Sequence, residues 1–228
     1  MTNKSIALSR TLVGVLLFAT LGWYAYSYML SEQQTSHTVA LAHTGAFDGQ
    51  QAYADVKTQL AFGPRIPGSQ AHHQVQELVR TELQEAGWQV EIQTTEALGH
   101  LVENIVAKRG DESPRVVIGA HYDSRMYADN DPNSANHVKP VPGANDGASG
   151  VAVLLELARS LPQDTVPVWL VFFDAEDNGR IEGWDWILGS REFVKNNSFQ
   201  PKAVIVIDMV GDEDLNIYKE QNSDPALT

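Results

Sequence analysis

The sequence contains no cysteine among its 228 residues. This absence excludes disulfide bonds, and it also excludes metal sites built on thiolates. Any transition metal in this protein must therefore be bound by histidine nitrogen or by the carboxylate oxygens of aspartate and glutamate.

Basic residues are scarce relative to acidic ones. The chain has 16 Lys and Arg residues against 29 Asp and Glu residues, which gives a formal net charge of -13 at pH 7. Binding to nucleic acid needs a surplus of basic side chains, so a nucleic-acid partner is excluded. The acidic surplus suits a metal ion, although a solvated acidic surface is the commoner explanation.

Long uncharged runs are missing except near the amino terminus. Residues 11–30 carry no charge and have the length needed to span a bilayer, and Lys4 and Arg10 precede them. Because positive flanks stay inside the cell, the pattern predicts a cytoplasmic tail at 1–10 and a single-pass anchor at 11–30 in the cell membrane, with the folded part outside the cytoplasm. A cleaved signal peptide is the alternative, but no clear cleavage site follows the run.

The rest of the chain alternates helical and strand patterns. Residues 31–50 are polar and predict a linker, so we expect a folded domain at 51–228. Strands that alternate with helices predict an α/β fold, a three-layer sandwich with a mixed, mostly parallel central sheet. Helices are expected at 52–60, 71–86, 147–161 and from Ser190, and strands at 88–93, 102–108, 115–120, 166–173, 203–207 and 215–219.

Ionisable residues stand where three of the predicted strands end. They are His121, the pair Glu176 and Asp177, and Asp208. Asp146, in the sequence Gly-Ala-Asn-Asp-Gly before a predicted helix, adds another carboxylate. Ligands of open α/β sheets bind outside the carboxyl ends of the strands, and zinc takes about four nitrogen and oxygen ligands. The pattern therefore predicts a zinc site at this edge of the sheet.

Each of these residues also has an ordinary structural explanation. His121 could be a hydrogen-bonded histidine at a sheet edge, Asp146 could cap the following helix, and Asp208 could begin a turn. Their joint placement favours a metal site over these explanations. His72 and His73, on the predicted helix 71–86, are expected to face solvent.

Six motifs follow one another along the chain. They are Gly63-Pro-Arg-Ile-Pro-Gly-Ser69, His121-Tyr-Asp-Ser, Gly143-Ala-Asn-Asp-Gly-Ala-Ser-Gly-Val, Glu176-Asp177, Gly189-Ser190 and Asp208-Met-Val-Gly. Together they resemble the family of zinc aminopeptidases that also contains the glutaminyl cyclases, over about residue 51 to the end. The resemblance implies a phosphorylase/hydrolase-like zinc exopeptidase fold, zinc as the cofactor, and peptide or protein amino termini as substrates.

The resemblance also implies a role for each candidate residue. In the aminopeptidases, Asp146 would bridge two zinc ions, with His121 and Asp208 on one ion and Asp177 on the other. Glu176 would be the general base that takes a proton from the attacking water. In the cyclases there is one zinc ion, Glu176 moves a proton from the attacking α-amine to the leaving ammonia, and Asp208 joins a catalytic proton relay.

Two features favour the cyclase branch. The second acid of the pair is Asp177, where aminopeptidases usually have glutamate, and the long loop before Gly189 carries Trp184 and Trp186, which resemble the wall of the cyclase substrate pocket. The retained His121 argues against it. We expect a glutaminyl cyclase that forms amino-terminal pyroglutamate. A di-zinc aminopeptidase is the alternative, and a non-catalytic ectodomain of the same fold is the second alternative.

The histidines stop early in the chain. All 7 lie at or before His137, whereas the family's last metal ligand is a histidine nearer the carboxyl end of the domain. We therefore expect a fragment with an incomplete metal sphere and an uncovered apolar sheet edge. Such a chain in isolation is expected to fold weakly and to have little activity.

Overall fold

The computed structural model describes residues 45–110, 113–163, 166–216 and 223–225. The predicted cytoplasmic tail, the anchor and most of the linker lie outside these ranges, as does most of the predicted strand 215–219. None of the helices in the described ranges is long and apolar enough to cross a membrane.

Five strands form one mixed sheet in the order β1-β2-β4-β3-β5. β3 pairs in parallel with β4 and β5, whereas β2 pairs antiparallel with β1 and β4. The predicted mixed sheet is confirmed, but the sheet is not mostly parallel. The strands are β1 (Gln89–Ala97), β2 (His100–Arg109), β3 (Val116–His121), β4 (Val168–Phe173) and β5 (Ala203–Val206).

A tight hairpin explains the antiparallel pairing of β1 with β2. Leu98 and Gly99 connect β1 to β2 with φ angles of 54° and 82°. Two consecutive residues with positive φ close a two-residue turn whose twist matches that of antiparallel strands. The strand pattern at 88–93 ends before this turn and the pattern at 102–108 begins after it, so the sequence alone did not indicate the hairpin.

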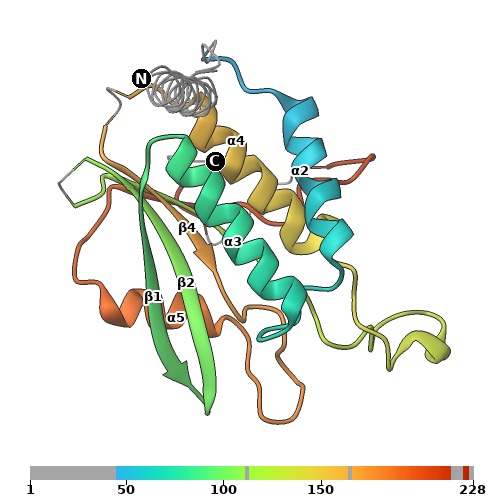
Figure 1. Ribbon diagram of the computed structural model, residues 1–228. Coiled ribbons are helices and arrows are strands. Elements are labelled where there is room, and N and C mark those ends of the chain that lie inside the picture. Colours follow the sequence, from blue (N-terminus) through green and yellow to red (C-terminus); the bar gives the residue numbers. More distant parts are fainter. Residues whose placement is uncertain (1–44, 111–112, 164–165, 217–222, 226–228) are drawn as a thin grey trace, which may run out of the picture. The chain divides into compact units, whose positions relative to one another are not determined.

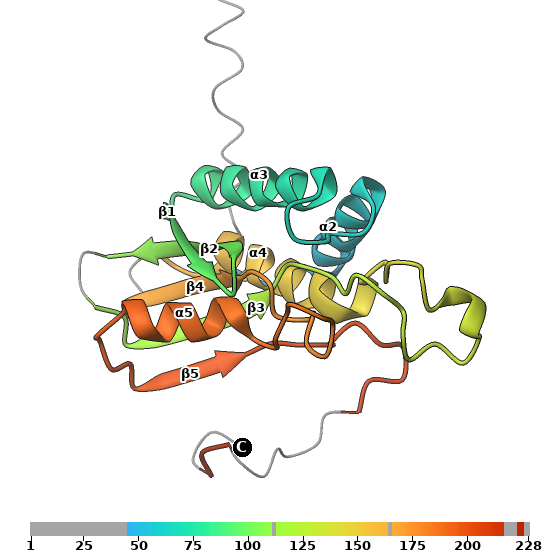
Figure 2. The ribbon, with the colours of Figure 1, turned by 90° about the horizontal axis from the view of Figure 1, so that it is seen from below.

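Helices cover both faces of the sheet (Figures 1 and 2). α3 (Gln70–Glu85) and α4 (Gly150–Ser160) pack on one face, with α2 (Gly49–Phe62) against α4, and α5 (Leu188–Asn196) packs on the other. The predicted helices are confirmed with shifted ends.

The burial of alternate strand residues shows the three layers directly. Leu170 and Phe172 of β4 belong to the core formed with α3 and α4, whereas Val171 and Phe173 pack with Phe193 of α5. Successive strand side chains point to opposite faces, so a strand that is buried throughout must be covered on both sides. All six residues of β4 are buried, as the continuous apolar run predicted.

β5 is the edge strand next to β3. Val204, Ile205 and Val206 are 54%, 43% and 65% exposed. The expected apolar edge is therefore present in the part of the chain that the structure describes. Unpaired strand edges with apolar side chains favour association with other chains.

Candidate metal and catalytic site

The candidate residues gather at one edge of the sheet because β3, β4 and β5 are parallel. His121 is the last residue of β3, Asp208 follows β5 by two residues, and Glu176 follows β4 by three. The carboxyl ends of parallel strands meet at the same edge, which is where open α/β sheets bind ligands. The structure places His121, Glu176 and Asp208 at this edge.

Asp146 reaches this edge from the turn Ala144–Ser149, which leads into α4. The turn interrupts the predicted helix 147–161: Asp146 is extended, and Gly147 has a φ of 88°. A Cβ atom at Gly147 would lie 2.8 Å from the carbonyl oxygen of Asp123 and 3.2 Å from the His121 ring. Glycine is therefore required both by the backbone conformation and by the close approach to His121.

Three of the predicted ligands form one cluster. The Nε2 atom of His121 lies 2.8 Å from a carboxylate oxygen of Asp146 and 3.6 Å from one of Asp208. One ligand atom from each residue lies within 4.8 Å of the others. Asp177, the fourth predicted ligand, is not part of this cluster, so the structure brings together three of the four.

A buried carboxylate connects the cluster to the loop that carries Glu176. Asp123 is fully buried, and one of its oxygens lies 3.2 Å from Nδ1 of His121. Its oxygens also accept hydrogen bonds from the backbone amides of Glu176 (3.1 Å) and Asp177 (3.2 Å). Sequence analysis assigned Asp123 no role. The spacing was a signal, because residues two apart at a strand end point to the same side.

The charges of the cluster depend on one another. Burial disfavours the imidazolium form of His121, but hydrogen bonds with Asp123, Asp146 and Asp208 outweigh it and raise the His121 pKa well above its ordinary value. Burial likewise opposes ionisation of Asp123, yet His121 and the two backbone amides hold the pKa of Asp123 below its usual range. The hydrogen bond with His121 also lowers the pKa of Asp208.

Glu176 is a partly buried carboxylate that Ser190 holds through both oxygens. One oxygen accepts the backbone N–H of Ser190 at 2.7 Å, and the other accepts the Ser190 hydroxyl at 3.0 Å. Burial raises the pKa of Glu176 to about 7 despite these hydrogen bonds. A carboxyl group with a pKa near neutrality can both take up and release a proton at physiological pH.

Asp177 lies in a similar electrostatic environment. Burial, followed by the charges of Asp146 and Asp123, raises its pKa to about 7. A cation between these carboxylates would relieve their mutual repulsion.

The donor set fits a zinc ion. Zinc binds imidazole nitrogen and carboxylate oxygen, and a metal-bound histidine usually donates its other ring N–H to a carboxylate. His121 has this arrangement, with Nε2 toward Asp146 and Asp208 and Nδ1 toward Asp123. The residues therefore suit the metal that the sequence predicted.

Arg65 holds the backbone around the site. It had no predicted role. It is fully buried and donates hydrogen bonds to the carbonyl oxygens of Tyr122 (2.9 Å), Pro142 (3.0 Å) and Gly143 (2.6 Å). Burial lowers its pKa to about 10, which leaves the guanidinium charged at neutral pH. Arg65 thus joins the end of β3 to the turn that carries Asp146.

The two predicted pocket tryptophans occupy different environments. Trp184 stacks on His100 of the hairpin, with ring centroids 3.7 Å apart. Trp186 lies against the guanidinium of Arg125, 5.0 Å from its carbon, and its ring fills the space over Gly179. Arg125 also donates a hydrogen bond to the carbonyl oxygen of Asp177 at 2.8 Å. Trp186 is therefore linked to the site, whereas Trp184 supports the hairpin.

One expectation about the helix 71–86 is wrong. His72 is only 2% exposed and bonds Asp174 at 2.7 Å, while His73 is exposed as predicted. An apolar stripe predicts which face of a helix is buried. A polar residue at the edge of that stripe is buried when the fold supplies a hydrogen-bond partner, as Asp174 does for His72.

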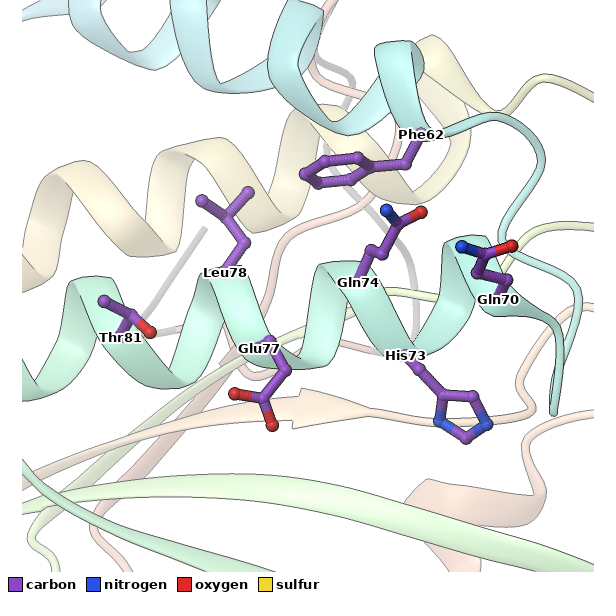
Figure 3. Close-up of a pocket in the computed structure, with 7 residues that line it drawn as sticks. All are labelled: Phe62, Gln70, His73, Gln74, Glu77, Leu78 and Thr81. Atoms are coloured by element: carbon purple, nitrogen blue, oxygen red, sulfur yellow. The ribbon is translucent and has the colours of Figure 1, made fainter.

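A separate groove of about 660 Å³ lies on the outer side of α2 and α3 (Figure 3). None of the candidate ligands lines it. Its walls are formed by Phe62, Gln70, His73, Gln74, Glu77, Leu78 and Thr81.

Comparison with known proteins decides the family. Residues 104–227, more than half of the chain, match the model of peptidase family M28. The chain belongs to this family. Family M28 accounts for the predicted resemblance and for a mixed α/β domain with a zinc-type site at the sheet edge.

Two solved structures and one curated relative resemble the chain. The glutaminyl cyclase of Tannerella forsythia is 39% identical with a TM-score of 0.70, over 76% of this chain and 66% of that one. A Zn-dependent exopeptidase from Parabacteroides distasonis is 36% identical with a TM-score of 0.72, over 77% and 66%. The uncharacterized protein YfbL of Escherichia coli is 35% identical over 156 residues, 67% of this chain. The chain spans 46% of that relative's length, about half.

Proposed function

We propose that this chain carries the metal and proton-transfer residues of a zinc-dependent glutaminyl cyclase, which converts an amino-terminal glutaminyl residue of a peptide or protein into pyroglutamate. The observation that carries the proposal is the position of Glu176. Its partly buried carboxylate has a pKa of about 7. Its backbone amide donates a hydrogen bond to Asp123, which in turn contacts His121 of the cluster with Asp146 and Asp208. The likeness to the cyclase of T. forsythia supports this branch of the family.

The zinc ion would supply polarisation of the side-chain amide of the substrate. Asp146 and Asp177 would hold it in the cyclase, and His121 with Asp208 would form the neighbouring hydrogen-bonded relay. Burial and, after it, the charge of Asp146 raise the pKa of Asp177, and the contribution from Asp146 supports a shared cation between these two carboxylates.

Glu176 would perform the proton transfers. The α-amine of the substrate attacks the side-chain amide carbon, a C–N bond forms, and Glu176 accepts the proton that the amine loses. The same proton then passes to the amide nitrogen, the old C–N bond breaks, and ammonia leaves. Ser190 holds both Glu176 oxygens in place during these steps. We propose Trp186 as the wall on which the closing ring packs.

An aminopeptidase with two zinc ions is the second candidate. The convergence of His121, Asp146 and Asp208 favours it, because these residues are the ones that would share one of two ions. The likeness to the exopeptidase of P. distasonis points the same way. A non-catalytic ectodomain is disfavoured by the retained Glu176, and absence of zinc from the purified protein would revive it.

Two substrates separate the candidates. The whole natural protein, loaded with zinc, is incubated with a glutaminyl dipeptide and with a leucyl chromogenic amide. The cyclase releases ammonia without new free amino acid, whereas the aminopeptidase releases the chromophore. Glu176→Gln should lower either activity about 10²- to 10⁴-fold, and Glu182→Gln, in an exposed part of the same loop, should not. If the natural protein releases no ammonia from the glutaminyl dipeptide, the cyclase proposal is wrong.

We further propose that residues 11–30 anchor the protein in the cell membrane with the catalytic part outside the cytoplasm. The uncharged run and the preceding Lys4 and Arg10 support this. Cell fractionation tests it: the protein should stay with the membranes after a high-salt wash and should be accessible to protease from outside the cell. Recovery in the soluble fraction would contradict the anchor.

A further inference from the structure

A second buried histidine–carboxylate pair lies two residues before Glu176. The Nε2 atom of His72 is 2.7 Å from a carboxylate oxygen of Asp174, and the two residues are 2% and 1% exposed. Neither residue takes part in the chemistry proposed above. Burying an ionisable pair costs free energy, so its contacts need an explanation.

The hydrogen bonds of His72 fix its tautomer and its direction. The backbone N–H of Gly68 donates to Nδ1 at 3.4 Å, so Nδ1 is an acceptor and Nε2 carries the proton that Asp174 accepts. The ring also stacks on Tyr122, with centroids 4.8 Å apart and planes 26° apart. His72 therefore presents one N–H to Asp174 in a fixed geometry.

Asp174 is held on its remaining sides by β2 and by the start of α5. Its second carboxylate oxygen accepts the backbone N–H of Glu103 at 2.9 Å. Its own N–H donates to the Asn104 side chain at 3.0 Å, and its carbonyl oxygen accepts the N–H of Gly189 at 3.0 Å. A Cβ at Gly189 would lie 2.2 Å from that carbonyl oxygen, so this close approach of the two backbones requires glycine.

The residue between Asp174 and Glu176 is strained. Ala175 is fully buried and has a φ of 52°, a left-handed conformation that is unfavourable for an alanine. Such a conformation persists only where its surroundings hold it. Asp174 fixes the backbone before Ala175, and Asp123 accepts the amide of Glu176 after it.

We propose that His72 and Asp174 are positioning residues: they hold the Ala175 turn in its left-handed conformation and so direct the Glu176 carboxylate at the reacting group. The inference rests on the proposed function, in which Glu176 transfers the proton. Proton transfer by Glu176 would then also require the buried hydrogen bond between His72 of α3 and Asp174, although neither residue touches substrate or metal.

Substitution of the donor tests the proposal in the zinc-loaded natural protein. His72→Leu should lower kcat about 10- to 100-fold, because a misplaced catalytic group costs this much, while KM and zinc per chain change less than about twofold. His72→Gln should restore most of kcat, since its amide N–H can reach Asp174 from near the Nε2 position. His73→Leu, the same change at the exposed neighbour, should leave kcat within about twofold of wild type.

A double variant shows whether His72 acts through Glu176. In a Glu176→Gln background, His72→Leu should cause no further loss, because both residues serve one step. An equal loss in both backgrounds, or His72→Leu behaving like His73→Leu, overturns the inference and leaves the role of Glu176 intact. Full activity of Glu176→Gln itself instead overturns the proposed function.

If His72→Leu does not fold, His72→Asn replaces it, because the shorter Asn amide cannot reach Asp174. Equal kcat values for the His72→Asn and His72→Gln variants would then overturn the inference.

Discussion

His121 and Asp123 are joined by a hydrogen bond of 3.2 Å, and the same Asp123 carboxylate accepts the backbone amides of Glu176 and Asp177. The end of β3 and the loop after β4 are thereby one hydrogen-bonded unit. A change in the charge of the metal cluster therefore reaches the loop that carries the proton-transfer residue through a single buried side chain.

Zinc affinity should rise with pH. The carboxylates around His121 raise its pKa well above the ordinary value, so without metal the imidazole keeps its proton at neutral pH. A zinc ion bound to His121, as in the aminopeptidase candidate, must displace that proton, and each unit of pH gained below the His121 pKa should raise the apparent affinity about tenfold per proton released. Competition with a chelator between pH 6 and pH 8 measures this, and an affinity independent of pH would count against His121 as a ligand.

Replacing Glu176 should stabilise the metal-free protein at alkaline pH. Its folded-state pKa is raised from 4.5 to about 7, so its stabilising contribution is fully present below about pH 4.5 and is lost as the pH rises through 7. Glu176→Gln keeps a neutral group and should exceed wild type by on the order of 2 kcal/mol at pH 8, with little difference at pH 5. Urea unfolding at both pH values measures the free energies, and a Gln variant less stable than wild type at pH 8 would refute the assignment.

Replacing Arg65 should lower the stability of the folded protein. Arg65→Met removes the buried donor that three carbonyl oxygens share and should cost at least about 3 kcal/mol of unfolding free energy. Arg80→Met, which alters a partly exposed surface pair, should cost less than about 0.5 kcal/mol. Equal losses in denaturant unfolding would show that the Arg65 hydrogen bonds do not hold the site together.

Replacing Trp186 and replacing Trp184 should have different effects on KM. Trp186→Ala should raise KM for a glutaminyl dipeptide about tenfold or more, because Trp186 adjoins the Asp177 loop through Arg125. Trp184→Ala, which removes the stack on His100, should change KM less than about twofold. The opposite order would place the substrate pocket at the hairpin.

The sequence predicted most elements of the fold because apolar periodicity survives in long helices and buried strands. The run 166–173 became β4, which is buried throughout, and the pattern at 71–86 became α3. The β1–β2 pairing was hidden because its turn has a non-glycine residue, Leu98, at positive φ. Such pairings are set by contacts between strands, which local patterns do not record.

The sequence predicted the candidate metal ligands, which stand in recognisable motifs, but not the residues that support them. His121, Asp146 and Asp208 stand at strand ends or turns, where unpaired ionisable groups have little structural reason to occur, and the structure brings them together. Asp123 and Arg65 act through buried hydrogen bonds to distant backbone atoms. One partner of Arg65, Gly143, is 78 residues away along the chain, and only the fold reveals such contacts.

The most direct test of the account is the zinc content of the natural protein and of Asp146→Ala, measured by mass spectrometry of the metal after dialysis. Asp146 belongs to the metal site in both candidate enzymes, whereas Asp214 is exposed and makes Asp214→Ala a matched control. We predict at least one zinc ion per chain in wild type and in Asp214→Ala, and a loss of bound zinc in Asp146→Ala. Absence of zinc from the wild-type protein, or equal zinc in all three, would contradict the account.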